Sequence, residues 1–204
     1  EMRSLTLPDG TKVQLNSKST LLYPQEFTGD SRSVFLLGEA NFKVKPDKKR
    51  PFIVKSNDLQ ITALGTEFNV SAYPESQEIA TTLISGSIRV DYNNLTTSVI
   101  LHPNEQFAYN RNNKKYDLSN PDMDDVTAWQ RGELVLQKMT LTDIILERKY
   151  PYAFVYSIKN LKNDRFSFRF KDNAPLEEVM EIIVNVVGQM DYRIVEDKCY
   201  LTRI

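Results

Sequence analysis

The stretch Leu37-Gly38-Glu39-Ala40-Asn41-Phe42-Lys43-Val44 decides the class of fold. Ala40, Phe42 and Val44 alternate with polar residues, which is the pattern of a β-strand with one buried face. Gly38 interrupts this run, and a single glycine between two β runs is typical of a bulge or a tight bend, because glycine tolerates positive φ and close backbone approach. The stretch therefore predicts two β runs that meet at an irregular point.

The same alternation extends over the first half of the chain, from about Leu5 to Leu118. Turn signals such as Pro8-Asp9-Gly10 and Pro74-Glu75-Ser76 separate the apolar runs and leave no room for a helix of normal length. A dozen or so short strands, in a sandwich or a coiled, solenoid-like stack, is the predicted architecture. Gly65 and Gly86 resemble Gly38, but their unequal spacing supports a true repeat only weakly.

The pattern changes after the polar, turn-rich segment 119–125, which we interpret as a domain boundary. The predicted domains are therefore a β-rich domain of residues 1–125 and a second domain of residues 126–204. Trp129, beside the boundary, is interpreted as an anchor that packs one domain on the other.

The second domain is predicted to be a small α+β domain with a duplicated βαβ unit. In the first unit, a strand at 134–136 precedes a helix that Thr140 caps and Pro151 stops, and a strand at 153–156 follows. In the second, the alternating strand 165–170 precedes a helix that begins at Pro175 and ends at Gly188. A closing hairpin at 192–195 and 199–201 completes the domain.

The composition excludes several classes of protein. The 26 basic and 27 acidic residues nearly cancel, so the chain has no global electrostatic reason to bind nucleic acid or anionic lipid. A membrane-spanning helix needs about 20 mostly apolar residues, and the sequence contains no such stretch. Since Glu1-Met2 is an unusual natural beginning, we expect the chain to be an excerpt of a longer protein.

The sequence offers no convincing catalytic or metal site. His102, the only histidine, precedes a proline in an expected turn, and Cys199, the only cysteine, lies in an expected buried strand. Asp122, Asp124 and Asp125 lack the glycine and glutamate that continue a calcium loop. The basic run 48–50 is interpreted as a solvated turn rather than a phosphate site. We therefore expect no enzyme activity, no cofactor and no small-molecule substrate.

Six segments, in order along the chain, resemble the FecR family of anti-sigma factors. They are Asp9–Asn16, Arg32–Val44, Arg50–Val54, Ala63–Val70, Leu83–Val90 and Leu101–Phe107. Gly132-Glu133-Leu134 and Leu141–Tyr150 resemble the C-terminal region of that family, which is similar to the short N-terminal fold of secretins and TonB-dependent receptors. Asn41 and Glu67 depart from the usual pattern.

This resemblance implies a role in signalling across the bacterial envelope. Family members are single-pass inner-membrane proteins whose cytoplasmic segment holds an extracytoplasmic-function sigma factor. Their periplasmic part receives a signal from the periplasmic signalling domain of a TonB-dependent outer-membrane transducer. The chain would be that periplasmic part, without the membrane helix and without the sigma-binding segment.

A small βαβ domain with open sheet edges can accept a strand from a partner protein. The expected docking residues are Val155, Tyr156, Ser157, Tyr200 and Leu201. The alternative is a non-catalytic carbohydrate-binding or assembly module of the cell envelope.

Overall fold

The computed structural model describes residues 2–139, 150, 152–156 and 165–203. The chain divides into two compact units, Glu1–Gln130 and Arg131–Ile204, each with its own hydrophobic core. The helix predicted between Thr140 and Pro151, apart from Tyr150, and the predicted docking residue Ser157 lie outside the described residues.

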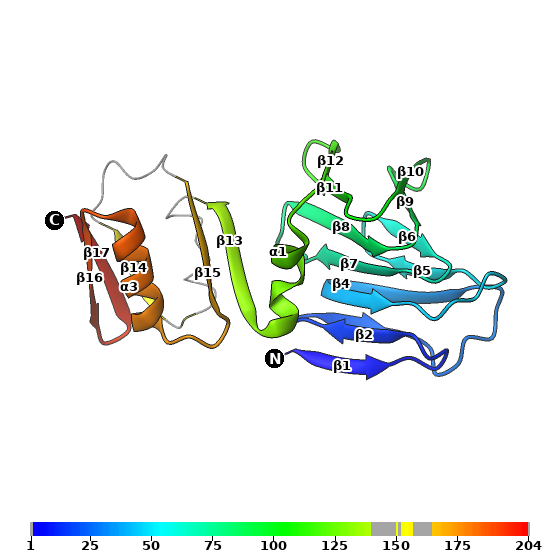
Figure 1. Cartoon of the computed structure of the whole chain (residues 1–204), viewed down its shortest axis with the longest axis horizontal. Coiled ribbons are helices and arrows are strands. Elements are labelled where there is room, and N and C mark those ends of the chain that lie inside the picture. Colours follow the sequence, from blue (N-terminus) through cyan, green and yellow to red (C-terminus); the bar gives the residue numbers. More distant parts are fainter. Residues whose placement is uncertain (1, 140–149, 151, 157–164, 204) are drawn as a thin grey trace. The chain divides into compact units, whose positions relative to one another are not determined.

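The first unit contains one twelve-stranded sheet and, between residues 2 and 122, no helix (Figure 1). Its strands are β1 (Arg3–Thr6), β2 (Lys12–Leu15), β3 (Thr20–Leu22), β4 (Arg32–Lys43), β5 (Phe52–Lys55), β6 (Gln60–Ala63), β7 (Glu67–Ala72), β8 (Glu78–Ser85), β9 (Ile88–Tyr92), β10 (Thr97–Leu101), β11 (Gln106–Asn110) and β12 (Tyr116–Ser119). The prediction of a β-rich domain of about a dozen short strands is confirmed.

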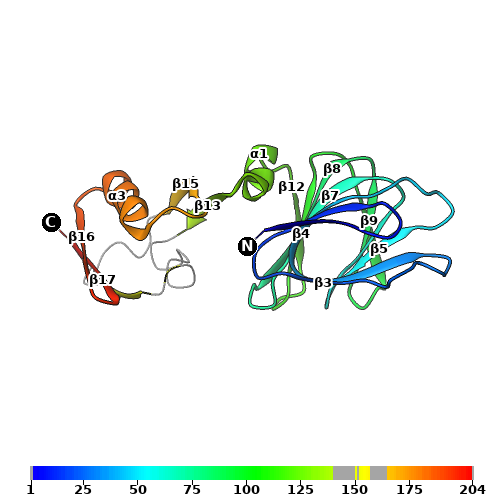
Figure 2. The ribbon, with the colours of Figure 1, turned by 90° about the horizontal axis from the view of Figure 1, so that it is seen from below.

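Strand β4 belongs to both halves of this sheet. Its first part pairs with β3 and, in parallel, with β5, which leads on to β6, β9 and β10. Its second part pairs antiparallel with β2 and β7, which lead to β1 on one side and to β8, β11 and β12 on the other. The sheet curls, and its two halves are seen from below in Figure 2.

The inner faces of the two halves enclose one apolar core. Val34, Leu36, Ala40 and Phe42 alternate along β4 and are all buried, as the sequence pattern predicts. The ring of Phe42, in the second part of β4, lies 6.0 Å from that of Phe52, in β5, between ring centroids. This contact links the second part of β4 to β5 across the core, although β5 pairs only with the first part of β4.

Gly38 stands where β4 passes from one half to the other. Its φ is +100°, and a Cβ added there would lie 2.7 Å from Ser19 Cα and 2.3 Å from Ser19 Oγ. The Ser19 hydroxyl accepts a hydrogen bond from Glu39 N at 2.8 Å, which fixes this approach. The irregular point predicted from the sequence is thus the place where the strand changes partners.

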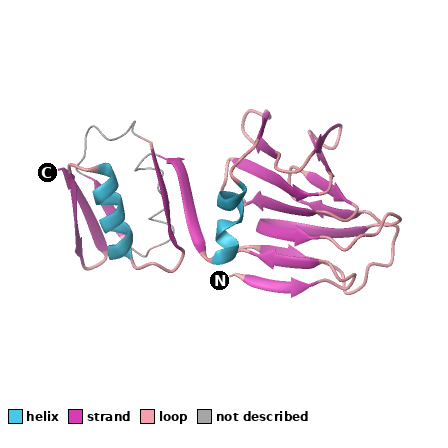
Figure 3. Ribbon diagram, in the orientation of Figure 1, coloured by secondary structure: helices cyan, strands magenta, loops and turns pink. Residues whose placement is uncertain are grey.

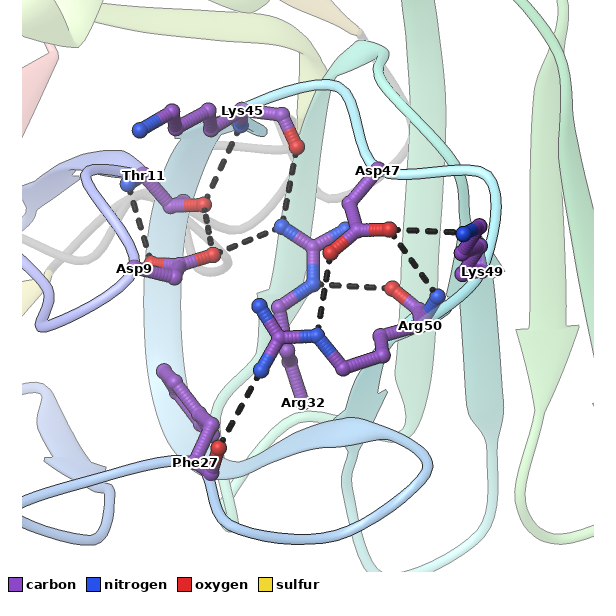
Figure 4. Close-up of polar contacts among 8 residues, drawn as sticks. All are labelled: Asp9, Thr11, Phe27, Arg32, Lys45, Asp47, Lys49 and Arg50. Atoms are coloured by element: carbon purple, nitrogen blue, oxygen red, sulfur yellow. Dashed lines mark hydrogen bonds and ion pairs between the residues drawn. The ribbon is translucent and has the colours of Figure 1, made fainter.

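A buried ion pair ties the turn before β2 to the start of β4 (Figure 4). Arg32 Nη1 lies 2.7 Å from Asp9 Oδ2, and the two side chains are only 1% and 5% exposed. The same guanidinium donates to the carbonyls of Lys45 and Arg50 at 2.8 and 2.9 Å. One side chain therefore closes the β1–β2 turn and the 45–50 loop against the edge of the core.

The Asp9 carboxylate is held ionised by its neighbours. Burial raises its pKa, but hydrogen bonds from the Thr11 hydroxyl and backbone N–H and the contact with Arg32 together bring that pKa below its usual value. The ion pair therefore contributes stability above the unfolded pKa of an aspartate, and this contribution is lost as the pH falls through the lowered pKa.

The basic run 48–50 lies in the turn that the sequence predicts. Asp47 Oδ1 accepts hydrogen bonds from the backbone N–H groups of Lys49 and Arg50, and Asp47 Oδ2 accepts one from Arg50 Nε at 3.0 Å. Arg50 Nη1 also donates to the Phe27 carbonyl at 3.2 Å (Figure 4). The hydrogen bonds of Arg50 therefore stabilise the loop that contains it.

The segment predicted as a polar boundary is partly helical. Helix α1 (Met123–Thr127) begins after Asp122, whose carboxylate accepts a hydrogen bond from Asp124 N at 2.8 Å. A 3-10 helix, η1 (Ala128–Arg131), follows and contains Trp129. The aspartates of this segment act as a helix cap and first-turn acids, which favour the positive end of a helix.

The described residues of the second unit form two small sheets and a helix (Figure 3). Strands β13 (Glu133–Met139) and β15 (Phe166–Lys171) pair antiparallel. Strands β14 (Ala153–Tyr156), β17 (Lys198–Arg203) and β16 (Met190–Val195) form a second sheet in that order, and α3 (Leu176–Val187) lies between β15 and β16 in the chain. Pro175 and Gly188 bound α3 as predicted. The prediction of a small α+β second domain is confirmed.

Replacing Gly38 with alanine should destabilise the first unit strongly. The new Cβ would collide with the backbone of Ser19 and would occupy a conformation that costs an L-residue about 1–2 kcal/mol before the clash is counted. We expect a loss of about 2–4 kcal/mol in the free energy of unfolding, measured by urea denaturation. Gly29→Ala is the matched control, because nothing lies within 4 Å of its added Cβ. Equal losses in the two variants would contradict the assignment of Gly38 as the constrained bend.

Asp9→Asn should leave the buried Arg32 guanidinium without its counter-charge. Breaking a buried pair by removing one partner costs about 3–5 kcal/mol, and we expect that loss near neutral pH. Since the carboxylate contributes only when ionised, the difference between Asp9→Asn and the unchanged chain should shrink in acid. Asp47→Asn, which removes an exposed pair, should have a much smaller effect. A difference that does not depend on pH would show that the charge of Asp9 is unimportant.

Candidate docking surface

The three-stranded sheet of the second unit has one covered face. Cys199 and Leu201 of β17, Phe154 of β14 and Met190 of β16 are buried with the apolar stripe of α3. That stripe consists of Leu176, Val179, Met180 and Ile183. It matches the apolar positions predicted from the helical spacing of the sequence.

The opposite face of this sheet is accessible. Val155, Tyr200 and Arg193 stand in one cross-strand row, because Val155 is in register with Tyr200 and Tyr200 with Arg193. The Val155 side chain is 41% exposed, and the Arg193 guanidinium lies 5.5 Å from the centre of the Tyr200 ring. We call Val155, Tyr200 and Arg193 the docking row.

Strand β14 lies at one end of the three-stranded sheet. It pairs in parallel with β17 and has no second partner among the described residues. Ala153 N donates to Asp197 O at 2.7 Å, so the N–H groups of Ala153 and Val155 point toward β17. The N–H group of Tyr156 consequently points away from β17. The edge of a sheet can template an added strand.

The structure brings some of the predicted docking residues together. Val155 and Tyr200 are neighbours on the accessible face, and Tyr156 is in register with Leu201. Leu201 is buried against α3, so it supports the sheet from inside. Sequence reasoning did not single out Arg193, although its alternation with Tyr192 and Ile194 placed it on the polar face of the hairpin.

The residues considered for catalysis hold structural positions. His102 is exposed in a turn, with Nδ1 3.3 Å from a carboxylate oxygen of Glu105. Cys199 is fully buried, and burial raises the pKa of its thiol to about 11. Within the described residues, no three histidine, cysteine or acidic side chains come together as metal ligands.

Comparison with known proteins places the chain in a family. The sequence profile of the FecR protein family matches residues 1–89, and that of the FecR C-terminal domain matches residues 133–201. Two crystal structures of "a putative anti-sigma factor" from Parabacteroides distasonis ATCC 8503 are similar over 100% of this chain and 95% of theirs. Both are 35% identical to it, with TM-scores of 0.84 and 0.83. The chain belongs to the FecR family.

The FecR and FecR C-terminal profiles each match residues within one of the two units. The FecR match runs from the N-terminus into β9, and the C-terminal match runs from β13 into β17. The FecR family comprises anti-sigma factors and is generally non-catalytic. No curated protein matches the chain. In the described part of the chain, no helix has the length and apolar character needed to cross a membrane.

Proposed function

We propose that this chain is the periplasmic, signal-receiving part of a FecR-type anti-sigma regulator. It would relay a signal from a TonB-dependent outer-membrane transducer to an extracytoplasmic-function sigma factor. The transducer would dock through its periplasmic signalling domain, and the sigma factor would bind a separate segment of the regulator. The membership of the FecR family supports this role in outline.

The observation that carries the docking proposal is the position of β14 at the end of its sheet, beside the docking row. There the backbone N–H of Tyr156 faces away from β17. The row beside it presents an aliphatic, an aromatic and a cationic side chain, and aromatic residues and arginine are enriched at protein interfaces. A strand added at β14 would gain hydrogen bonds from the edge and contacts from Val155.

Val155→Glu should weaken the complex with the signalling domain of a cognate transducer. A charge introduced beside the proposed strand would have to be desolvated, and we expect the dissociation constant to rise about tenfold or more, measured by isothermal titration calorimetry. Val186→Glu is the matched control, since Val186 is an equally apolar, 57% exposed residue on α3. If both variants raise the dissociation constant equally, or if neither raises it, the docking site lies elsewhere.

A proline at Tyr156 tests strand addition directly. It would remove an N–H that faces away from β17 and leave the ladder between β14 and β17 intact, so affinity should fall while the thermal midpoint changes little. Val155→Pro is the counterpart, because it removes an N–H that faces β17 and should lower the thermal midpoint instead. Unchanged affinity in a folded Tyr156→Pro variant would exclude pairing at this edge.

A further inference from the structure

Strand β12 stands at one end of the path of strands in the first unit (Figure 1). Among the described residues it pairs only with β11, in antiparallel register. All four of its residues, Tyr116–Ser119, are exposed. The edge of a sheet presents backbone groups that can pair with another strand, so this edge is a candidate interface.

The backbone groups of Tyr116 and Leu118 face away from β11. Asn110 N donates to Lys115 O at 2.8 Å, so the carbonyl of Lys115 points toward β11. Along an antiparallel strand, successive residues direct their N–H and C=O groups to alternate sides. The groups of Asp117 therefore also point toward β11, whereas those of Tyr116 and Leu118 are directed to the outer side of the edge.

Two apolar side chains of β12 are left partly uncovered at this edge. Tyr116 is 43% and Leu118 is 48% exposed. They are register partners of the buried Tyr109 and Phe107, so they lie on the core side of the sheet. The Tyr116 ring stacks on that of Phe107, with 5.0 Å between centroids, which holds the edge in place. An added strand would cover apolar surface that is already ordered.

The charged side chains of β12 and of the residue before it lie on the other face and differ in sign. Lys115 and Asp117 are both exposed, and they alternate with Tyr116 along the strand. Neither side chain forms an ion pair with another residue in the described part of the chain. The edge therefore presents one unpaired cation and one unpaired anion, two residues apart.

This spacing makes the edge complementary to itself. If two copies of the strand pair antiparallel with Tyr116 opposite Tyr116, Lys115 of each copy stands opposite Asp117 of the other. Opposite charges directly across two strands are favourable, and like charges are not. A register centred on Asp117 would set two aspartates face to face, and one centred on Leu118 would set Asp117 opposite Ser119. Charge complementarity thus selects the register centred on Tyr116.

We infer that two copies of this chain associate through β12, antiparallel about a two-fold axis at Tyr116. The N–H of each Tyr116 donates to the carbonyl of the other, and Lys115 and Asp117 form two equivalent ion pairs. The interface is isologous, since the same patch serves both copies. Because so short a strand buries little area, we expect a dissociation constant on the order of 100 μM. The inference goes beyond the proposed function and does not depend on it, because β12 and the docking row belong to different units.

An introduced cysteine tests the position of the two-fold axis. The Cα atoms of a hydrogen-bonded antiparallel pair lie about 5.5 Å apart, within the range of a disulfide. Under mild oxidation, Tyr116→Cys should form a linked dimer at least about tenfold faster than Ile100→Cys, measured on non-reducing gels. Ile100 is the matched control because it is 51% exposed on β10, another strand at the end of the path. The native Cys199 is buried. Equal rates of cross-linking in the two variants would overturn the inference.

A charge swap tests the ion pairs without altering the apolar side chains. Sedimentation equilibrium of the chain of residues 1–204, at about 10 μM to about 1 mM, should show a reversible dimer. Lys115→Asp and Asp117→Lys should each weaken it at least about fivefold, because like charges then face each other twice. The double variant should restore the dimer, and Asp30→Lys, a change at an exposed loop residue, should leave it unchanged. A chain that stays monomeric over this range, or a double variant no better than the single ones, would overturn the inference.

Discussion

The change of partners along β4 is the constraint on which the first unit depends. One strand of twelve residues supplies a parallel neighbour to β5 and an antiparallel neighbour to β7. Strand β4 can change partners because Gly38 has no side chain and the backbone of Ser19 can approach the Cα of Gly38. The Arg32–Asp9 pair at the start of β4 and the Phe42–Phe52 contact on its inner face then hold the two halves of the sheet around a common core.

The sequence predicts the strands and the apolar core of the first unit well, because alternation reports directly which side chains face inward. It predicts neither the sharing of β4 between halves nor the order of the strands, since these depend on contacts between distant segments. The buried pairing of Arg32 illustrates the limit: an arginine between two β runs has the same local pattern whether it is solvated or enclosed. The helix at Met123 was hidden by its polar composition, although the Asp122 cap was visible in the sequence.

The candidate sites differ in how far they could be predicted. Val155 was accessible to sequence reasoning because it lies on an edge strand of the sheet, whereas Tyr200 lies on the central strand β17 and is its register partner. Arg193 needed the hairpin register, which sets it beside Tyr200.

The position of Cys199 has a practical consequence for work on this protein. It is the only cysteine in the chain, and both its burial under α3 and the raised pKa of its thiol keep it from reacting in the folded state. A single cysteine introduced at an exposed site would therefore be the only thiol open to a fluorophore or spin label. Two such cysteines, one in each unit, would allow the distance between the units to be followed spectroscopically without removing Cys199.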